Sequence, residues 1–188
     1  MLATLRPALV LLLLFTLLTG LAYPLGFTGV AQLLFPAQAN GSLLERDGQV
    51  VGARLIGQAF ATPGYFHGRP SAIGYDASTS GGTNLGPTNA GLIAAIGERA
   101  LAESAAAGGA VVPLDLVTSS ASGLDPHISP AAARLQVARV AAARGLDPVR
   151  VAALVEAAVE GPLLGLLGEP RVNVLELNLA LDRLAGGQ

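Results

Sequence analysis

The chain has 188 residues, enough for one domain and an appended segment, and 52% of them are hydrophobic against 13% charged, an apolar balance for a soluble protein. Its formal net charge of −2 provides no basic surface for nucleic acid, and the lack of cysteine excludes disulfides and thiolate sites. Every basic side chain is an arginine, so the chain lacks the lysine that P-loop and phosphorylated-aspartate ATPase centres require.

An uncharged run extends from Pro7 to Leu44, and its first half is almost purely aliphatic. About 20 such residues cross the hydrocarbon core of a bilayer as a helix. The sequence therefore predicts a transmembrane helix over residues 7–34, with a core at about 8–27. A short segment, residues 1–6, precedes it. Pro24 and Gly26 are expected to kink its far end.

A cleaved signal peptide is the alternative to a retained anchor. Gly20-Leu21-Ala22 and Ala37-Gln38-Ala39 both have the small residues of a cleavage site. However, the apolar run continues beyond the first of these sites, through Leu33, Leu34 and Phe35. This continuation favours a retained, single-pass anchor.

The distribution of positive charge predicts the orientation of this anchor. Arg6 and the terminal amine precede the span, and the first basic residue after it is Arg46. The positive-inside rule then keeps the N-terminus in the cytoplasm. We expect residues 35–188 to form one extracytoplasmic domain.

The patterns beyond the anchor predict an α+β fold, a mixed α/β domain. Asp47-Gly48 is a hairpin signal before a strand at residues 50–58. A second strand is predicted at residues 111–118. Cap residues and apolar periodicity predict four helices. These helices are expected at residues 90–107 (capped by Thr88 or Asn89), 130–144, 148–160 and 174–184 (opened by the Asn173-x-x-Glu176 capping box).

Residues 60–89 form a long stretch rich in glycine, serine, threonine, asparagine and proline. A loop of this length inside a domain is typically functional or disordered. Tyr65, Phe66, Ile73 and Tyr75 can pin it to the body of the domain, which argues against disorder. We therefore expect an ordered, functional loop, and we call it the recognition loop because one alternative function given below uses it for binding.

His67 and Arg69 are the chemically most versatile residues of this loop. No second histidine lies at ligand spacing from His67, so no metal site is predicted. The short apolar stretch at residues 163–168 cannot span a membrane, and it predicts either core packing or a contact with a partner.

Residues 117–130 place serine, aspartate and histidine close together, as in hydrolases. Asp125-Pro126 and Ser129-Pro130 are, however, helix-start patterns, as is Asp147-Pro148 further on, so Asp125, Ser129 and Asp147 are predicted to be caps. There is also no Gly-x-Ser-x-Gly elbow. We predict no catalytic residues, and an anchored hydrolase that uses His127 or His67 stays as the less favoured alternative.

Six separated stretches of the chain are similar in sequence to one protein family. They are Leu-Asp-Leu-Val-Thr running into Ser-Ala-Ser-Gly-Leu-Asp-Pro-His-Ile-Ser-Pro at residues 114–130, and residues 38–43, 55–60, 65–71, 84–89 and 168–175. Over essentially its whole length, the chain resembles the C subunit of Kdp-type potassium-transporting ATPases.

This resemblance implies an accessory, non-catalytic subunit of an ATP-driven potassium uptake complex in the bacterial inner membrane. The implied partners are the potassium-pathway subunit, the P-type ATPase subunit and a small one-helix subunit, beside the lipid bilayer. Potassium and ATP would be handled by those partners, and no cofactor is expected on this chain. The family is described as helping the ATPase subunit to bind ATP. An extracytoplasmic domain would lie across the membrane from that ATP, so a role in assembly or ion entry is physically simpler.

The anchor offers a face on which such a partner could pack. Thr16, Thr19, Gly20 and Tyr23 follow i, i+3, i+4, i+7 spacing, and small or hydroxyl residues let membrane helices approach closely. A membrane-anchored binding module that uses residues 65–89 stays as an alternative function. The full set of interaction and structural candidates is Thr16, Thr19, Gly20, Tyr23, Tyr65, Phe66, His67, Arg69, Asn84, Asn89, Ser122, Asp125 and His127.

Overall fold

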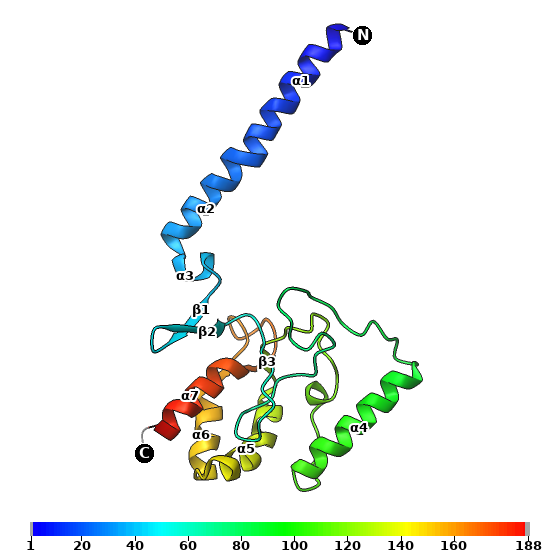
Figure 1. Cartoon of the computed structure of the whole chain (residues 1–188), viewed down its shortest axis with the longest axis vertical. Helices are drawn as coiled ribbons and strands as arrows, with labels where there is room; N and C mark the ends of the chain where they lie inside the picture. The colour runs from blue at the N-terminus through cyan, green and yellow to red at the C-terminus, as the bar shows by residue number, and fades with distance from the viewer. Residues whose placement is uncertain (1, 187–188) are drawn as a thin grey trace. The chain divides into compact units, whose positions relative to one another are not determined.

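The computed structural model describes residues 2–186, and these form two compact units that meet between Val50 and Val51 (Figure 1). The first unit is dominated by one long helix. The second holds four helices, a small sheet and long ordered loops. Each unit is described here by itself.

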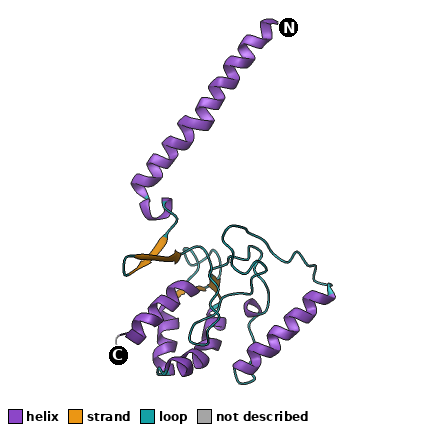
Figure 2. Cartoon of the chain, in the orientation of Figure 1, coloured by secondary structure: helices purple, strands orange, loops and turns teal. Residues whose placement is uncertain are grey.

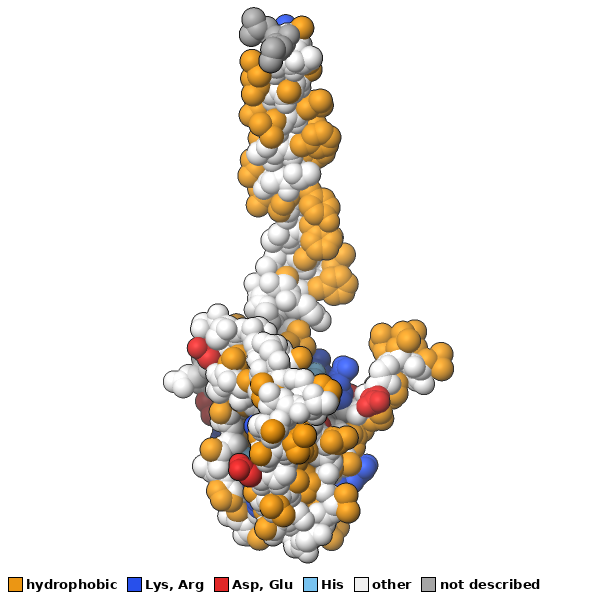
Figure 3. Space-filling view, turned by 90° about the vertical axis from the view of Figure 1, so that its right-hand side faces the viewer, with side chains coloured by type: hydrophobic (Ala, Val, Ile, Leu, Met, Phe, Trp, Pro, Cys, Tyr) orange, Lys and Arg blue, Asp and Glu red, His pale blue; other side chains and the backbone are white. Residues whose placement is uncertain are grey.

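The long helix consists of α1 (Leu2–Leu17), a π-helical turn η1 (Leu18–Ala22) and α2 (Tyr23–Leu34). Its stretch Ala3–Leu34 is long and apolar enough to cross a membrane, and none of its most apolar window is buried inside the protein. Figure 3 shows hydrophobic side chains along its whole length. The segment predicted to span the membrane is thus helical, and the helix itself begins at Leu2, before the predicted span.

The irregularity in this helix lies before Pro24 rather than at Gly26. The Tyr23 N–H donates to the Leu18 carbonyl, as a π-helical turn requires. Proline has no N–H, and in a regular helix its ring clashes with the carbonyl four residues earlier, here that of Gly20. The wider turn relieves that conflict. The extra residue also rotates later positions by about 100°, so Tyr23 does not share a regular α-helical face with Thr16.

A short helix and a hairpin follow the long helix. Helix α3 (Pro36–Ala39) reverses the chain, and the side-chain amides of Gln32 and Asn40 exchange hydrogen bonds of 3.1 Å. Strands β1 (Leu43–Arg46) and β2 (Gln49–Ala53) then pair with each other. Asp47 and Gly48 both have positive φ, at 52° and 76°, so the predicted hairpin turn is confirmed. The predicted strand ends early, at Ala53.

Three helices make the body of the second unit: α5 (Pro130–Arg144), α6 (Pro148–Ala157) and α7 (Val174–Gly186). They pack with a small antiparallel sheet in the order β3 (His127–Ile128), β5 (Arg171–Asn173) and β4 (Val159–Glu160). Helix α4 (Ala90–Ala106) contains no fully buried residue.

The predicted strand at residues 111–118 is wrong. Its centre forms the 3-10 turn η2 (Leu114–Leu116), in which the Leu116 N–H donates to the carbonyl of Pro113. Proline cannot donate to a strand ladder, so this segment turns instead of pairing.

Four of the predicted helix caps are confirmed. The side chains of Asn89, Ser129, Asp147 and Asn173 accept hydrogen bonds from the first backbone N–H groups of their helices. The cap prediction for Asp125 is wrong. The chain after it enters β3, where His127 pairs with Asn173, and the Val174 N–H donates to the Pro126 carbonyl.

The buried core lies between these three helices and the sheet. Apolar periodicity predicts inward faces for α6 (Val151, Leu154, Val155, Ala158) and α7 (Val174, Leu177, Leu181, Leu184), and both faces are confirmed. For α5 it predicts Leu135, Val137, Ala138 and Ala141, and the observed face is rotated, because Ala138 is exposed while Val140 is buried. The fully buried core includes Phe66, Ala132, Val140, Val151, Val155, Val172, Leu177 and Leu181.

Residues 60–89 have no regular helix or strand, yet they are held in place (Figure 2). Phe66 is completely buried, as its predicted pinning role requires. Its backbone N–H and carbonyl both bond the side-chain amide of Asn178, at 2.9 and 3.0 Å. The guanidinium group of Arg139 donates to the carbonyls of Pro63 and Tyr65. The loop is therefore an ordered part of the domain.

Candidate functional site, a polar groove beside a leucine turn

Two loops that are far apart in the sequence meet at the candidate site. The Ser71 hydroxyl donates to the Gly123 carbonyl at 2.7 Å, and the Ser120 N–H donates to the Pro70 carbonyl at 3.1 Å. The predicted recognition loop and the serine-rich stretch before His127 are thus one continuous surface.

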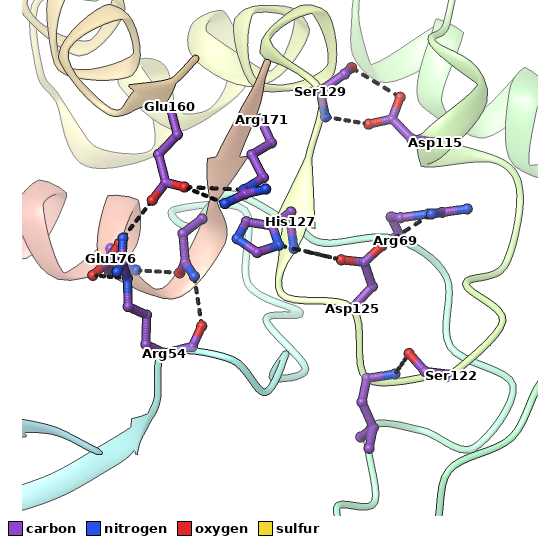
Figure 4. A network of polar contacts seen from close by, with 12 residues as sticks. Arg54, Arg69, Asp115, Ser122, Asp125, His127, Ser129, Glu160, Arg171 and Glu176 are labelled. Atoms are coloured by element: carbon purple, nitrogen blue, oxygen red, sulfur yellow. Dashed lines mark hydrogen bonds and ion pairs between the residues drawn. The ribbon is translucent and has the colours of Figure 1, made fainter. Parts of the chain in front are cut away.

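Arg69 and Asp125 form the ion pair at the centre of this surface. The guanidinium nitrogen Nη1 lies 3.1 Å from Asp125 Oδ2, and both side chains are about half-buried (Figure 4). The His127 N–H donates to Asp125 Oδ1 at 3.0 Å, and the His127 imidazole Nδ1 lies 3.7 Å from the same oxygen. Three of the predicted candidate residues are thereby brought together.

Electrostatics stabilise the ionised form of Asp125. Burial by itself would raise the pKa of this carboxyl, but the hydrogen bonds from His127 and the charge of Arg69 outweigh burial and hold its pKa below the ordinary range. Tyr75 packs against the same pair and donates from its hydroxyl to the Arg69 carbonyl. Burial, helped by the Asp125 charge, raises the pKa of Tyr75.

A groove of about 260 Å³ opens beside this ion pair, and we call it the polar groove. It joins the two loops to the edge of the sheet, so both cations and carboxylates face it. Its lining residues are Arg69, Asp115, Asp125, His127, Ile128, Ser129, Glu169, Pro170 and Arg171.

A second ion-pair group lies at the sheet side of the groove. Glu160 pairs with Arg54 at 2.6 Å and with Arg171 at 3.1 Å, and Arg54 also reaches Glu176 at 3.0 Å (Figure 4). None of these four residues is among the sequence candidates. Arg171 lies inside one of the family-like stretches, which was the one available clue to its position.

Residues 163–168, the leucine turn, connect β4 to β5 and flank the groove. Their four leucines are largely exposed, which excludes the core packing that was one of two predictions for this stretch. The Leu163 N–H donates to the Leu167 carbonyl at 2.8 Å, so the turn is hydrogen-bonded.

The serine, aspartate and histidine residues do not form a catalytic triad. The Ser129 hydroxyl donates to Asp115 and caps α5, and the Ser122 hydroxyl accepts from the Leu124 N–H. Within residues 2–186, no serine hydroxyl is hydrogen-bonded to either histidine ring. The described residues also contain no group of three or more His, Asp or Glu side chains able to hold a metal ion.

His67 lies in a different cavity, of about 340 Å³, bordered by the loop, Arg99 and Glu103 of α4, and η2. Its ring nitrogen Nε2 is 3.0 Å from the Thr62 carbonyl. Burial lowers the pKa of His67. Arg69 lines both this cavity and the polar groove, so it lies between His67 and His127, and the two histidines belong to different sites.

The remaining loop candidates have structural positions. The Tyr65 hydroxyl donates to Asp182 at 3.2 Å, and the Arg144 guanidinium stacks over the Tyr65 ring at 4.3 Å. Asn84 is exposed and has a φ of 53°, a left-handed conformation that asparagine tolerates. Asn89 is the cap of α4.

The anchor candidates lie around the π-helical turn. The Thr19 hydroxyl donates to the Phe15 carbonyl at 2.6 Å, which satisfies it within the helix. A Cβ atom added at Gly20 would meet no atom within 4 Å. Gly20 is therefore not required by packing within this chain.

Comparison with known proteins gives a consistent result over the whole chain. The family model described as "K+-transporting ATPase, c chain" (KdpC) matches residues 5–183. A protein of Polaromonas naphthalenivorans named potassium-transporting ATPase KdpC subunit is 64% identical over 185 residues, covering 96% of this chain and 94% of that protein. Proteins of the same name from Caulobacter vibrioides and Rhodospirillum rubrum are each 61% identical, covering 97% of this chain and 94% and 96% of their own lengths.

Proposed function

We propose, from the premise that the chain belongs to the KdpC family, that it stabilises the assembly of its K+-transporting ATPase complex. Family membership makes it an accessory subunit of that complex and not the catalytic one. The proposal rests on one observation about the two units of the chain. A helix long enough to cross a bilayer has its most apolar stretch fully exposed, and it is joined to a separate domain with an open polar surface.

The helix supplies attachment within the bilayer. Burial of leucine against leucine gives little advantage over lipid, so close packing at small residues decides helix association in membranes. Thr16, Thr19 and Gly20 form such a small, hydroxyl-rich patch, and the space around Gly20 is open in this chain. We place the potassium-pathway subunit against this patch.

The domain supplies a second attachment on the membrane surface. Positive charge before the helix orients the chain with its N-terminus in the cytoplasm, so the domain lies outside. The joined loops then cover the outer mouth of the potassium pathway. Their hydroxyl, amide and carbonyl oxygens suit the approach of an alkali cation, and Asp125 compensates the charge of Arg69.

The P-type ATPase subunit and the small one-helix subunit complete the proposed set of partners. Any promotion of ATP binding by this chain would act through these subunits, because the proposed orientation separates the domain from cytoplasmic ATP by the bilayer. Nucleotide affinity of the assembled complex would then depend on this chain, while the isolated chain would bind no nucleotide.

Gly20→Leu tests the proposed assembly role. We expect the variant to insert and fold normally, because no atom within 4 Å opposes a side chain there, but to be lost from the complex. Co-purification of the tagged full chain with its membrane partners, and potassium-stimulated ATPase activity, provide the measurement. Gly26→Leu is the matched control, since Gly26 is equally open and lies beyond the π-helical turn.

Full retention of the Gly20→Leu chain at wild-type stoichiometry and activity would show that this helix patch is not the attachment site. If both the Gly20→Leu and the Gly26→Leu chains were lost from the complex, added bulk anywhere on the helix would be the cause, and not one specific face. Failure of the wild-type chain to co-purify would contradict the assembly role itself.

A further inference from the structure

The leucine turn presents four large apolar side chains to solvent on an otherwise ordered domain. Leu164 and Leu166 are 85% and 86% exposed, more than most leucines of the membrane helix itself. Leu163 and Leu167 are 68% and 63% exposed. Contiguous exposed apolar groups of this kind mark interaction sites.

The turn is built to hold these leucines in place. Besides the bond from Leu163 to Leu167, the Gly165 N–H donates to the Pro162 carbonyl at 3.0 Å. Leu164 has a φ of 54°, the left-handed region that a bulky residue rarely adopts. Backbone strain at such a residue persists only where the surroundings impose it, and it is concentrated at functional segments.

The base of the turn is clamped by charge. Glu160 and Arg171 are directly opposite each other in the β4–β5 pair, and their side chains are joined at 3.1 Å. Arg54 binds Glu160 from the other side. Glu169 is the one acidic residue between Glu160 and Arg171 in the chain. It is exposed, and within residues 2–186 its carboxylate has no cationic partner.

We infer that the leucine turn docks into an apolar pocket on another subunit of the same ATPase complex, and that this pocket is bordered by a basic side chain that pairs with Glu169. This inference rests on the proposed assembly function and names a surface for it. The polar groove beside the turn would form the rim of the same interface.

Charge favours a protein partner over the two other candidate occupants. A loop that inserts into anionic lipid is normally flanked by basic side chains, whereas here Arg171 is already paired and Glu169 adds negative charge. A symmetric contact with a second copy of the chain would bring two Glu169 carboxylates toward one axis, and their repulsion opposes it.

The test compares three full-length chains expressed with the rest of the complex: wild type, Leu164→Asn/Leu166→Asn, and the control Val111→Asn/Leu114→Asn. Val111 and Leu114 are 93% and 73% exposed, so the control removes similar apolar surface elsewhere. Asparagine tolerates positive φ, so the change at Leu164 leaves the fold intact. We expect at least about a tenfold loss of co-purified partner for the first variant alone. Circular dichroism should show equal thermal midpoints for all three chains.

A photo-crosslinking residue substituted for Leu166 identifies the occupant. Crosslinks to another subunit of the complex are expected, and crosslinks to lipid or to a second copy would overturn the inference. Wild-type recovery of partner with the Leu164→Asn/Leu166→Asn chain would overturn it as well, as would an equal loss with the control. Absence of partner from the wild-type preparation would instead refute the assembly function on which the inference rests.

Discussion

Asp125 shows how much the role of one residue depends on distant partners. A carboxylate before a proline suggests a helix cap, and the chain there forms a strand instead. The carboxylate binds Arg69, which is 56 residues away in the sequence, and the backbone of His127. Its negative charge therefore stabilises the ion pair with Arg69, whereas a helix cap would work equally well with a neutral asparagine.

We predict that Asp125→Asn lowers the free energy of unfolding at neutral pH by about 1 kcal/mol, since the ion pair is partly solvated. The folded-state pKa of Asp125 lies below its ordinary value of 3.8, so its contribution is present above that value and is lost as the pH falls through the folded-state pKa. The difference between the two chains should therefore shrink as the pH falls below 3.8, and it should vanish once the pH is below the folded-state pKa.

Urea unfolding of the detergent-solubilised full chain at several pH values, followed by circular dichroism, measures this difference. Asp147→Asn is the control, because asparagine also caps helices well and Asp147 serves as a cap. A pH-independent difference for Asp125→Asn would contradict the ion-pair account.

At the scale of elements, helix α7 fixes the recognition loop. The buried amide of Asn178 accepts from the Phe66 N–H and donates to the Phe66 carbonyl, as a neighbouring strand would. A buried loop backbone needs such partners, because water cannot reach it. The irregular loop thus has a fixed position without belonging to a sheet.

Asn178→Ala should destabilise the domain by at least about 2 kcal/mol, because two buried backbone groups of Phe66 lose their partners. Thermal or urea unfolding of the full chain checks this value. Arg183→Ala on the exposed side of the same helix should change stability by less than about 0.5 kcal/mol. Similar effects of the two substitutions would mean that the Asn178 amide does not hold the loop.

Local patterns predicted the helices well and the sheet poorly. The extent of α5 and the caps Ser129 and Asn89 follow from residues within one turn of each helix end. Strands of two or three residues, such as β3, have no alternation to detect and exist only because distant segments pair. The ion pair between Arg54 and Glu160 could not be predicted either, because its two residues are 106 positions apart in the sequence.

At the scale of the whole molecule, the N-terminal helix and the domain are two separate compact units. The helix, a candidate membrane span, has its apolar residues outward, and the domain has its own core. Composition predicted this division, because the first 44 residues carry a single charged side chain, that of Arg6. The π-helical turn could not be predicted from periodicity, since it depends on how the backbone accommodates Pro24.

The orientation prediction concerns the whole chain. A reporter enzyme that is active only outside the cytoplasm, fused to the C-terminus, should be active, and the same fusion with a cytoplasm-specific reporter should be silent. Protection of the domain from protease added to intact spheroplasts would contradict the proposed topology. A mature chain beginning at Tyr23 or Asn40 would show that the apolar segment is a cleaved signal.

The contacts that hold the recognition loop also set the order in which the chain can fold during synthesis. The Phe66 N–H can bond the Asn178 side chain only after the ribosome has added 112 more residues. The Arg54 carbonyl, just before the loop, can bond the Asn173 side chain only after 119 more residues. Contacts of such long sequence separation form late and slowly. The anchor is therefore complete while the ribosome is still making the domain. The domain stays open until α7 has emerged, so a nascent chain that stalls before α7 should remain an inserted but unfolded and protease-sensitive product.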